Sequence, residues 1–401
     1  MNKKMTDNRD NSNFAVSRRA FLRIGSGSLF ALSQVACTAT QIRQGITTSH
    51  ELYKGNISQA VAAQVPSLGI PEVDGLIKKQ ITHLLDQLAQ TWGEQRIASP
   101  KEYVKYTHAY QSRAVINFTT GKIQVETLIN QAPKSELKKA IVSTLLTPND
   151  PFQVDLFSAK PIPIGQLPFL VDLVHDHENK AIRYAWRANR FADYLIKNSY
   201  KTRKETLNGQ NRLRHYVSFD MLKDYQRQQK HRYQKEVLRH AKRFHVEPAL
   251  IYGIIETESA FNPFAISSAP AYGLMQIVPT TAGRDAYELI HKRPGTPSKK
   301  TLFNPSQNIE YGVAYLSILS NRYLSGVRHP KSKEYCVIAG YNTGAGNVLK
   351  SFDTDRKQAV RKINAMNPQQ VYQHLTQQLK HAEARRYLAK VTENKRKYYI
   401  T

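Results

Sequence analysis

Cysteine and acidic residues are scarce in this 401-residue chain, which has only Cys37 and Cys336 and 31 acidic residues against 58 lysines and arginines. No zinc-ligand spacing, RNP-like strand or basic zipper region is present, which argues against a nucleic-acid-binding protein despite a formal charge of +27. That charge predicts a polyanionic neighbour, such as an acidic membrane surface or a charged cell-wall polymer. The apolar run over residues 24–36 is too short to span a membrane. The length favours two or three domains, and Cys336, in an apolar helical run, is predicted to be a buried small hydrophobic residue.

Residues 1–37 are predicted to be an export signal. The segment 17–23 (SRRAFLR) resembles a twin-arginine signal, and the apolar run follows it at the expected place. Cys37 comes directly after Val35-Ala36, where a bacterial lipoprotein carries its modified cysteine, although Gln34 stands where lipoboxes favour Leu. We expect lipidation of Cys37, which excludes a disulfide framework by count, and a periplasmic protein anchored to the outer membrane. The alternative is cleavage nearby and release of a soluble chain.

Residues 38–68 mix Thr, Gln, Ser and Ala without sustained periodicity, so they are predicted to form a tether. Residues 69–222 are predicted to form an α+β N-terminal domain with helices packed on an antiparallel sheet. The patterns within it predict helices over 70–92 and 135–146, a hairpin of the runs 114–118 and 122–128 around Gly121, and strands near 170–174 and 212–219.

Aromatic and basic side chains are interleaved near the start of this domain, at Tyr103, Lys105, Tyr106, Tyr110 and Arg113. They could stack sugars and pair with peptide carboxylates, or they could pack in the interior with only the tyrosine hydroxyls in polar surroundings. Packing is the favoured interpretation. We expect this domain to position the enzyme or the glycan rather than to do chemistry.

Residues 223–401 are predicted to be almost wholly helical, beginning with a connector over 225–244 that is dense in Arg, Lys, Gln and His. Further helices are predicted over 309–324, 333–340, 355–366 and 368–378, with the turn Gly344-Ala345-Gly346 closing one of them.

The helix predicted over 249–259 places one carboxyl among apolar groups. Pro248 suits its first turn, and three isoleucines at helical spacing, beginning with Ile251, form a stripe that continues to Glu258. Glu256 falls on the other side of the helix. A carboxyl in apolar surroundings keeps its proton near neutral pH because desolvation disfavours the charge, so Glu258 is a candidate general acid. The alternative is that Glu258 ends an amphipathic helix on a solvated edge.

Four motifs in a fixed order favour the interpretation of Glu258 as a general acid. They are Glu258-Ser259, Gly273-Leu274-Met275-Gln276, Gly340-Tyr341-Asn342 and Arg386-Tyr387-Leu388. In this order they resemble the goose-lysozyme-like lytic transglycosylases, which carry a catalytic Glu-Ser pair, a Gly-Leu-Met-Gln turn, an Ala-Tyr-Asn element and a late Arg-x-Tyr. The stretch 100–118 looks like the amino-terminal domain of membrane-bound members of that class. The resemblance therefore covers nearly the whole mature chain.

The resemblance implies a mainly α, lysozyme-like catalytic domain that cleaves peptidoglycan without water, metal or cofactor, and it gives no reason to expect a nucleic-acid partner. Glu258 would protonate the oxygen between N-acetylmuramic acid and N-acetylglucosamine, then take the proton of the muramic 6-hydroxyl and so leave a 1,6-anhydro end. It also implies hydrogen bonds to the sugar from Ser259 and Gln276, an apolar wall from Met275, cleft lining by Tyr341 and Asn342, and orientation of the acetamido group by Tyr387.

Each implied role has a structural alternative. Met275 could be core, Ser259 could cap the helix end, and Asn342 could bond its own turn. The sequence also departs from the family twice: Gly340 stands where Ala is usual, and Pro270 lies in the loop before Gly-Leu-Met-Gln, where Gly or Asp is frequent.

Most glycoside hydrolases use two carboxylates, and the resemblance supplies one. Glu256 lies on the opposite helix face, and Asp285, Glu288 and Glu310 match no catalytic position, so they are predicted to be structural or solvated. Two alternatives remain open. A hydrolytic muramidase would give reducing ends, and a non-catalytic peptidoglycan-binding lipoprotein would tolerate Glu258→Gln.

Overall fold

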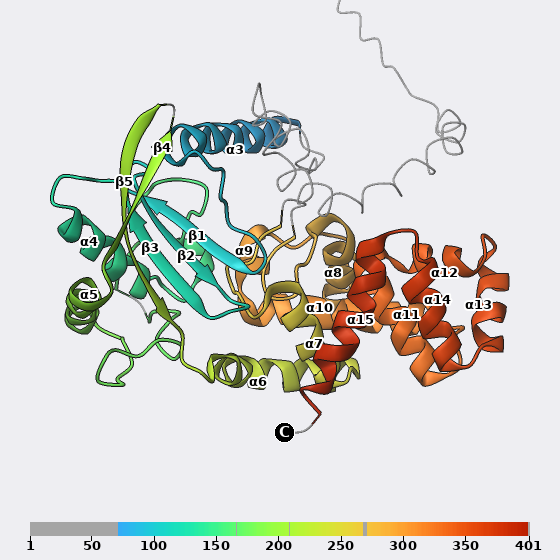
Figure 1. Ribbon diagram of the computed structural model, residues 1–401. Helices are drawn as coiled ribbons and strands as arrows, with labels where there is room; N and C mark the ends of the chain where they lie inside the picture. The colour runs from blue at the N-terminus through green and yellow to red at the C-terminus, as the bar shows by residue number, and fades with distance from the viewer. Residues whose placement is uncertain (1–70, 166, 208, 268–270, 400–401) are drawn as a thin grey trace, which may run out of the picture. The chain divides into compact units, whose positions relative to one another are not determined.

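The computed structural model describes residues 71–165, 167–207, 209–267 and 271–399 (Figure 1). The described residues up to 222 are called the sheet domain below, and those from 223 onward the helical domain. This arrangement confirms an α+β N-terminal domain followed by a mainly α domain. The predicted export signal, Cys37, the tether and Pro270 lie outside the described residues.

In the described part of the chain, five strands form one antiparallel sheet in the order β1-β2-β3-β5-β4. The predicted hairpin is confirmed as β2 (Ser112–Asn117) and β3 (Lys122–Thr127), joined through Gly121 at a φ of 73°, which glycine adopts without strain. The strand expected near 212–219 is β5 (Gln210–Asp220), which pairs with β3. The edges of the sheet are β1 (Glu102–Thr107) and β4 (Lys201–Leu207).

Alternate residues of a strand point to the same side of a sheet, and on one side of this sheet those residues are apolar. Ile123, Val125 and Val217 on this face are fully buried. The helices α4 (Pro133–Leu145) and α5 (Ala185–Ser199) pack against the sheet, and α4 confirms the helix predicted over 135–146 (Figure 1).

The opposite face carries buried ions. Arg113 and Arg214 bind the same oxygen of Glu126, at 2.7 and 3.1 Å, and both guanidinium groups lie against the ring of Trp92. Trp92 ends α3 (Pro71–Trp92), which confirms the helix predicted over 70–92. The interleaved residues Tyr103, Lys105, Tyr106 and Arg113 are all buried, so the packing interpretation is confirmed for them.

The prediction of a strand near 170–174 is wrong. The amides of Leu173 and Val174 both donate to the carbonyl of Leu170, so the segment is a run of turns, and its apolar residues are there because they are buried. The edge strands β1 and β4 were not predicted. Four successive residues of β1 are buried instead of alternating with exposed ones, and β4 is mostly polar and exposed.

The helical domain confirms the predicted helices. Proline occupies the first turn of α7 (Pro248–Ser259), α10 (Pro305–Ile318), α11 (Pro330–Thr343) and α14 (Pro368–Gln378), where its fixed φ and missing N–H cost nothing. Gly344, at a φ of 83°, separates α11 from α12, and Cys336 is fully buried as expected. The remaining α-helices of the described part are α6 (Tyr225–Phe244), α8 (Arg284–His291), α9 (Lys299–Phe303), α12 (Ala345–Phe352), α13 (Arg356–Ala365) and α15 (Ala382–Arg396).

The helix α7 packs along α15 and against α6 (Figure 1). Ile251, Ile254 and Ile255 are fully buried. Ala260, the residue after α7, takes a left-handed φ of 49° and donates its amide to the carbonyl of Glu256. The last turn of α7 therefore holds both Glu256 and Glu258 at a fixed place in the domain.

Candidate active site

Glu258 lies in the last turn of α7 and is only partly exposed. The hydroxyl of Tyr387, from α15, donates a hydrogen bond of 2.7 Å to its Oε1. Burial of the carboxyl raises the pKa of Glu258 to about 7, and the hydrogen bond from Tyr387 opposes this shift by favouring the ionised form. A carboxyl that titrates near neutral pH can both give and take a proton in one reaction.

Two further charges act on this carboxyl. Glu383, one turn before Tyr387 on α15, raises the pKa of Glu258, and Lys101, the residue before β1, lowers it. Tyr341 of α11 also lies close: its own pKa is raised well above the usual value by burial and by the charge of Glu258.

Glu256 points away from this site, as the helical spacing predicted. Its carboxylate accepts hydrogen bonds from Lys397 at 2.6 Å and from the hydroxyl of Tyr398 at 2.9 Å. Asp285 and Glu310 are also bound elsewhere in the fold, to Tyr323 and Arg243 respectively.

Residues near the end of α15 fix this helix on α7 and on α11. Asn394 donates to the hydroxyl of Thr257 at 3.0 Å, and the buried Lys395 binds Glu334 at 2.7 Å. A Cβ on Gly253 would meet the backbone of Lys395 at 3.0 Å, so α15 lies directly on α7 at this point. This close docking sets the position of Tyr387 relative to Glu258.

A tight turn from Tyr272 to Gln276 packs beside the end of α7. Its shape depends on Asn308 of α10, a fully buried residue that accepts the amide of Met275 at 2.7 Å and donates to the carbonyls of Tyr272 and Leu302. Gly273 has a φ of 73°, and a Cβ there would lie 2.5 Å from the Asn308 amide. Sequence reasoning missed Asn308, because a single asparagine within a helical run carries no local signal.

Two of the predicted sugar contacts are fully buried. The hydroxyl of Ser259 lies 2.8 Å from the carbonyl of Leu274 and 3.0 Å from that of Ile255, so it ties α7 to the turn. The side chain of Met275 packs against Gly312 in the core, while its carbonyl accepts the hydroxyl of Tyr341 at 2.9 Å. Both residues therefore hold the turn in place beside α7 and α11. Nothing in the described structure supports a direct contact of either side chain with a sugar.

Gln276, Tyr341 and Asn342 are partly exposed, unlike Ser259 and Met275. The amide nitrogen of Gln276 donates to the carbonyl of Gly273 at 3.0 Å, whereas its Oε1 is buried without a partner among the described residues. The side chain of Asn342 makes no hydrogen bond to any residue that the structure describes. The side-chain amide of Asn342 is therefore available to a ligand, whereas the unpaired Oε1 of Gln276 lies beneath the surface.

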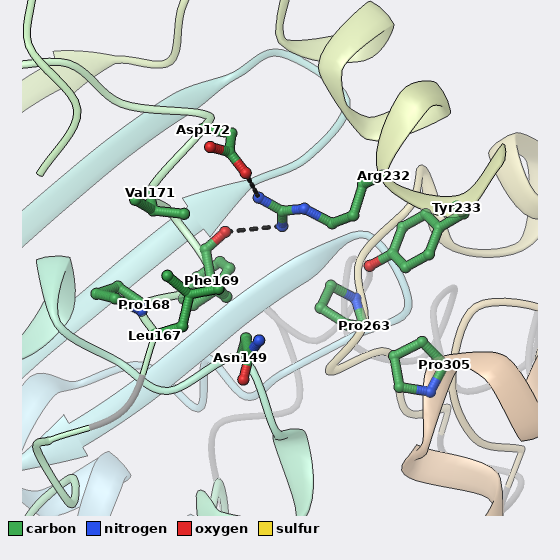
Figure 2. Close-up of a pocket in the computed structure, with 10 residues that line it drawn as sticks. All are labelled: Asn149, Leu167, Pro168, Phe169, Val171, Asp172, Arg232, Tyr233, Pro263 and Pro305. Carbon is green, nitrogen blue, oxygen red and sulfur yellow. Dashed lines mark hydrogen bonds and ion pairs between the residues drawn. The ribbon is translucent and has the colours of Figure 1, made fainter. Parts of the chain in front are cut away.

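Two cavities of the described structure are not lined by Glu258. The pocket in Figure 2 has a volume of about 260 Å³ and is lined from both domains; there Arg232 bonds the carbonyl of Phe169 at 2.8 Å and Asp172 at 3.3 Å. The second, of about 380 Å³, lies between α14 and α15 and includes Arg386. Among the described residues, no group of three or more His, Cys, Asp or Glu could hold a metal ion. No helix in the described ranges is long and apolar enough to cross a membrane.

Comparison with known proteins gives two family matches that together span most of the described chain. Residues 71–232 match the N-terminal domain of membrane-bound lytic murein transglycosylase C, and residues 236–364 match the transglycosylase SLT domain. Proteins named membrane-bound lytic murein transglycosylase C from Yersinia pestis (strain Pestoides F) and Yersinia pseudotuberculosis (serotype O:1b, strain IP 31758) are each 42% identical over 326 residues. That alignment covers 80% of this chain and 89% of each relative.

Solved structures give a weaker match. The 70 kDa soluble lytic transglycosylase SLT70 from Escherichia coli is 24% identical, with a TM-score of 0.31, over 41% of this chain and 23% of that one. An inactive mutant of the lytic transglycosylase Slt from Pseudomonas aeruginosa is also 24% identical, with a TM-score of 0.29, over 40% of this chain and 23% of that one.

The helical fold around Glu258 and the matching SLT domain define a lytic transglycosylase. Within that class, identity of 42% over 89% of the relatives' length shows that the chain belongs to the membrane-bound lytic murein transglycosylase C family. The resemblance inferred from the four motifs is thereby confirmed.

Proposed function

We propose that this chain is a peptidoglycan lytic transglycosylase of cell-wall turnover and remodelling. It cleaves the β-1,4 bond between N-acetylmuramic acid and N-acetylglucosamine and leaves 1,6-anhydro ends. The observation that carries the proposal is the carboxyl of Glu258, partly exposed, bound by the Tyr387 hydroxyl at 2.7 Å, and with a pKa raised to about 7 by burial. Membership of a family whose relatives are named murein transglycosylases supports the substrate.

The first step uses Glu258 as an acid. Its carboxyl proton passes to the glycosidic oxygen, the bond from that oxygen to the muramic C1 breaks, and the N-acetylglucosamine side leaves as an alcohol. The muramic 2-acetamido oxygen assists by donating electrons to C1. A pKa near 7 keeps a large part of Glu258 protonated at neutral pH, which an ordinary glutamate would not achieve.

The second step uses the same group as a base. The carboxylate of Glu258 takes the proton of the muramic 6-hydroxyl while that oxygen bonds to C1 and displaces the acetamido oxygen. Glu258 is protonated again at the end, and no water is consumed. The hydrogen bond from Tyr387 stabilises the carboxylate between the two steps.

The other predicted site residues divide into two groups in this proposal. Gln276, Tyr341 and Asn342 face the sugar, since each is partly exposed. Ser259 and Met275 act as positioning residues, because they are buried and fix the turn that carries Gln276. Tyr387 orients Glu258 directly, in addition to the orientation of the acetamido group that the resemblance implies.

A hydrolytic muramidase is the second candidate, and Glu383 is the observation that bears on it. Hydrolysis needs a second carboxylate across the bond, about 5 to 9.5 Å from the first. Glu383 is close enough to raise the pKa of Glu258. In the transglycosylase mechanism Glu383 transfers no proton, so Glu383→Gln should remain active. In a hydrolytic muramidase that uses Glu383 as its second carboxylate, the same substitution should abolish activity.

We further propose that the protein works in the periplasm, attached to the outer membrane through a lipid on Cys37. The relatives are named membrane-bound, and the motif around Cys37 supports an acyl anchor. Metabolic labelling with a palmitate analogue should mark the wild type and not Cys37→Ser. Labelling of both proteins would contradict the anchor.

Clearing of purified peptidoglycan sacculi tests the catalytic assignment. The clearing rate of Glu258→Gln should be at least about a hundredfold lower than that of the wild type, because glutamine can neither donate nor accept the proton. Glu393→Gln makes the same chemical change at an exposed carboxylate of α15 and should clear at the wild-type rate. Equal rates for both variants would contradict the assignment and favour a binding protein.

A further inference from the structure

The sheet domain reaches the end of the catalytic helix through Asn262, four residues after Glu258. The side chain of Asn262 is fully buried, and its amide nitrogen donates to the carbonyl of Pro100 at 3.1 Å. Its Oδ1 accepts the amide of Phe264 at 3.0 Å, which fixes the chain direction after α7. The residue that follows Pro100 is Lys101, so the backbone of Lys101 is held beside the segment that leaves the catalytic helix.

Aromatic packing makes this junction rigid. The ring of Phe264 lies 5.1 Å from the ring of Tyr103 in β1 and 4.9 Å from that of Phe169. Phe264, Tyr103 and Phe169 are each at most 1% exposed, so the two domains share a core here. Lys101 also lends its carbonyl to the amide of Phe118 at 3.0 Å, which keeps it in register with the sheet.

The ionisable groups whose charge or hydrogen bond acts on Glu258 come from three parts of the fold. Glu383 and Tyr387 belong to α15, Tyr341 belongs to α11, and Lys101 is the residue directly before β1. Glu383 favours the protonated carboxyl, whereas Tyr387 and Lys101 favour the ionised one. Among the charged groups that act on Glu258, Lys101 is the cation, and it comes from the other domain.

We propose that Lys101 is a positioning residue of the active site, whose ammonium group balances the charge of Glu258 after it has given up its proton, so that the sheet domain completes the catalytic centre. The inference rests on the function proposed above. A single carboxyl that acts first as acid and then as base must be stable in both protonation states, and burial disfavours the ionised state. A fixed cation lowers the free energy of that state without taking part in proton transfer.

The test compares Lys101→Met with Lys101→Arg, and uses Lys122→Met as the control. Lys122 is an exposed lysine on β3 of the same domain. The rate of anhydro-product formation is measured against pH for each protein. Loss of the cation should move the alkaline limb of kcat/KM to higher pH, and Arg should restore its position, because the limb reports Glu258 in the free enzyme. An alkaline limb for Lys101→Met that matches Lys122→Met would overturn the inference.

A second measurement does not depend on catalysis. The free energy of unfolding differs between the protein with Glu258 and the Glu258→Gln variant. This difference changes with pH as Glu258 titrates. The midpoint of that change should move to higher pH in the Lys101→Met background. An unmoved midpoint would contradict the role of Lys101 even in an active enzyme, whereas a moved midpoint without any anhydro product would uphold the contact and contradict the proposed function.

Discussion

The hydroxyl of Tyr387 lies 2.7 Å from Oε1 of Glu258, although the two residues are 129 positions apart in the chain. The contact joins the helix that carries the acid to the helix that closes the domain. It stabilises the carboxylate, so it works against the burial that raises the pKa of Glu258. The proton affinity of the site therefore depends on how α15 docks on α7.

Tyr387→Phe should shift the activity profile and lower the rate. Without the hydroxyl, the pKa of Glu258 rises above about 7, so the alkaline limb of kcat/KM moves to higher pH. A hydrogen bond to a charged group contributes roughly 1.5 to 3 kcal/mol, so kcat should fall about tenfold to a hundredfold. Rates of anhydro-product formation from pH 5 to 9 give both quantities. Tyr194→Phe, at an exposed tyrosine of α5, is the control, and a Tyr387→Phe profile that superimposes on it would rule out the assigned role.

Glu383→Gln should retain activity and move the same limb in the opposite direction. The charge of Glu383 raises the pKa of Glu258, so its removal lowers that pKa and the enzyme loses activity at a lower pH than the wild type. The pH profile of product formation measures the shift. If Glu383→Gln abolishes activity at every pH, Glu383 is a second catalytic carboxylate and the hydrolytic mechanism gains support.

Glu258→Gln should stabilise the fold at alkaline pH. The pKa is about 7 in the folded chain against 4.5 for an ordinary glutamate, so between these values the unfolded chain binds fewer protons and stability falls as pH rises. The full cost above pH 7 is at most about 3 kcal/mol, and none of it is present below pH 4.5, where both states hold the proton. Gln does not titrate and avoids this cost.

Urea unfolding at pH 4.5 and pH 8 measures this difference. The gain from Glu258→Gln over the wild type should be near zero at the lower pH and largest at the higher pH. Glu393→Gln, at an exposed carboxylate, should show no such trend. A gain that is independent of pH would mean that Glu258 is ordinarily ionised in the folded chain.

Asn308→Ala should unfold the turn that supports the site. Three buried backbone groups, the amide of Met275 and the carbonyls of Tyr272 and Leu302, lose their partner. Each unpaired buried group costs about 1 to 3 kcal/mol, so the free energy of unfolding should fall by roughly 3 kcal/mol or more. Asn321→Ala removes an exposed asparagine that bonds Ser317 and should change stability by less than about 0.5 kcal/mol. Similar unfolding midpoints for the two variants would contradict this role of Asn308.

The sequence predicted the parts of the site that depend on one helix. Glu256 and Glu258 face opposite sides because a helix turns about 100° per residue, and that period can be counted from the sequence alone. The antiparallel hairpin and the proline-led starts of α7 and α14 were predictable for the same reason, since turn chemistry and helix starts are local.

The contacts between distant segments were not predictable. Asn308 reaches a turn 33 residues before it, and Lys101 acts on Glu258 from another domain. Ser259 and Met275 illustrate the same point, because the motif contains them while their burial depends on how the turn packs against α7 and α10. The apolar run over 170–174 looked like a strand because buried turns and buried strands share composition.

Mass spectrometry of the muropeptides released from purified peptidoglycan by the signal-less protein, in water labelled with oxygen-18, tests the central claim most directly. Intramolecular attack by the 6-hydroxyl predicts products that are one water lighter than reducing muropeptides, carry no heavy oxygen, and disappear with Glu258→Gln. Reducing ends that carry oxygen-18 would contradict the claim, because they would show that water, and not the substrate's own hydroxyl, attacks C1.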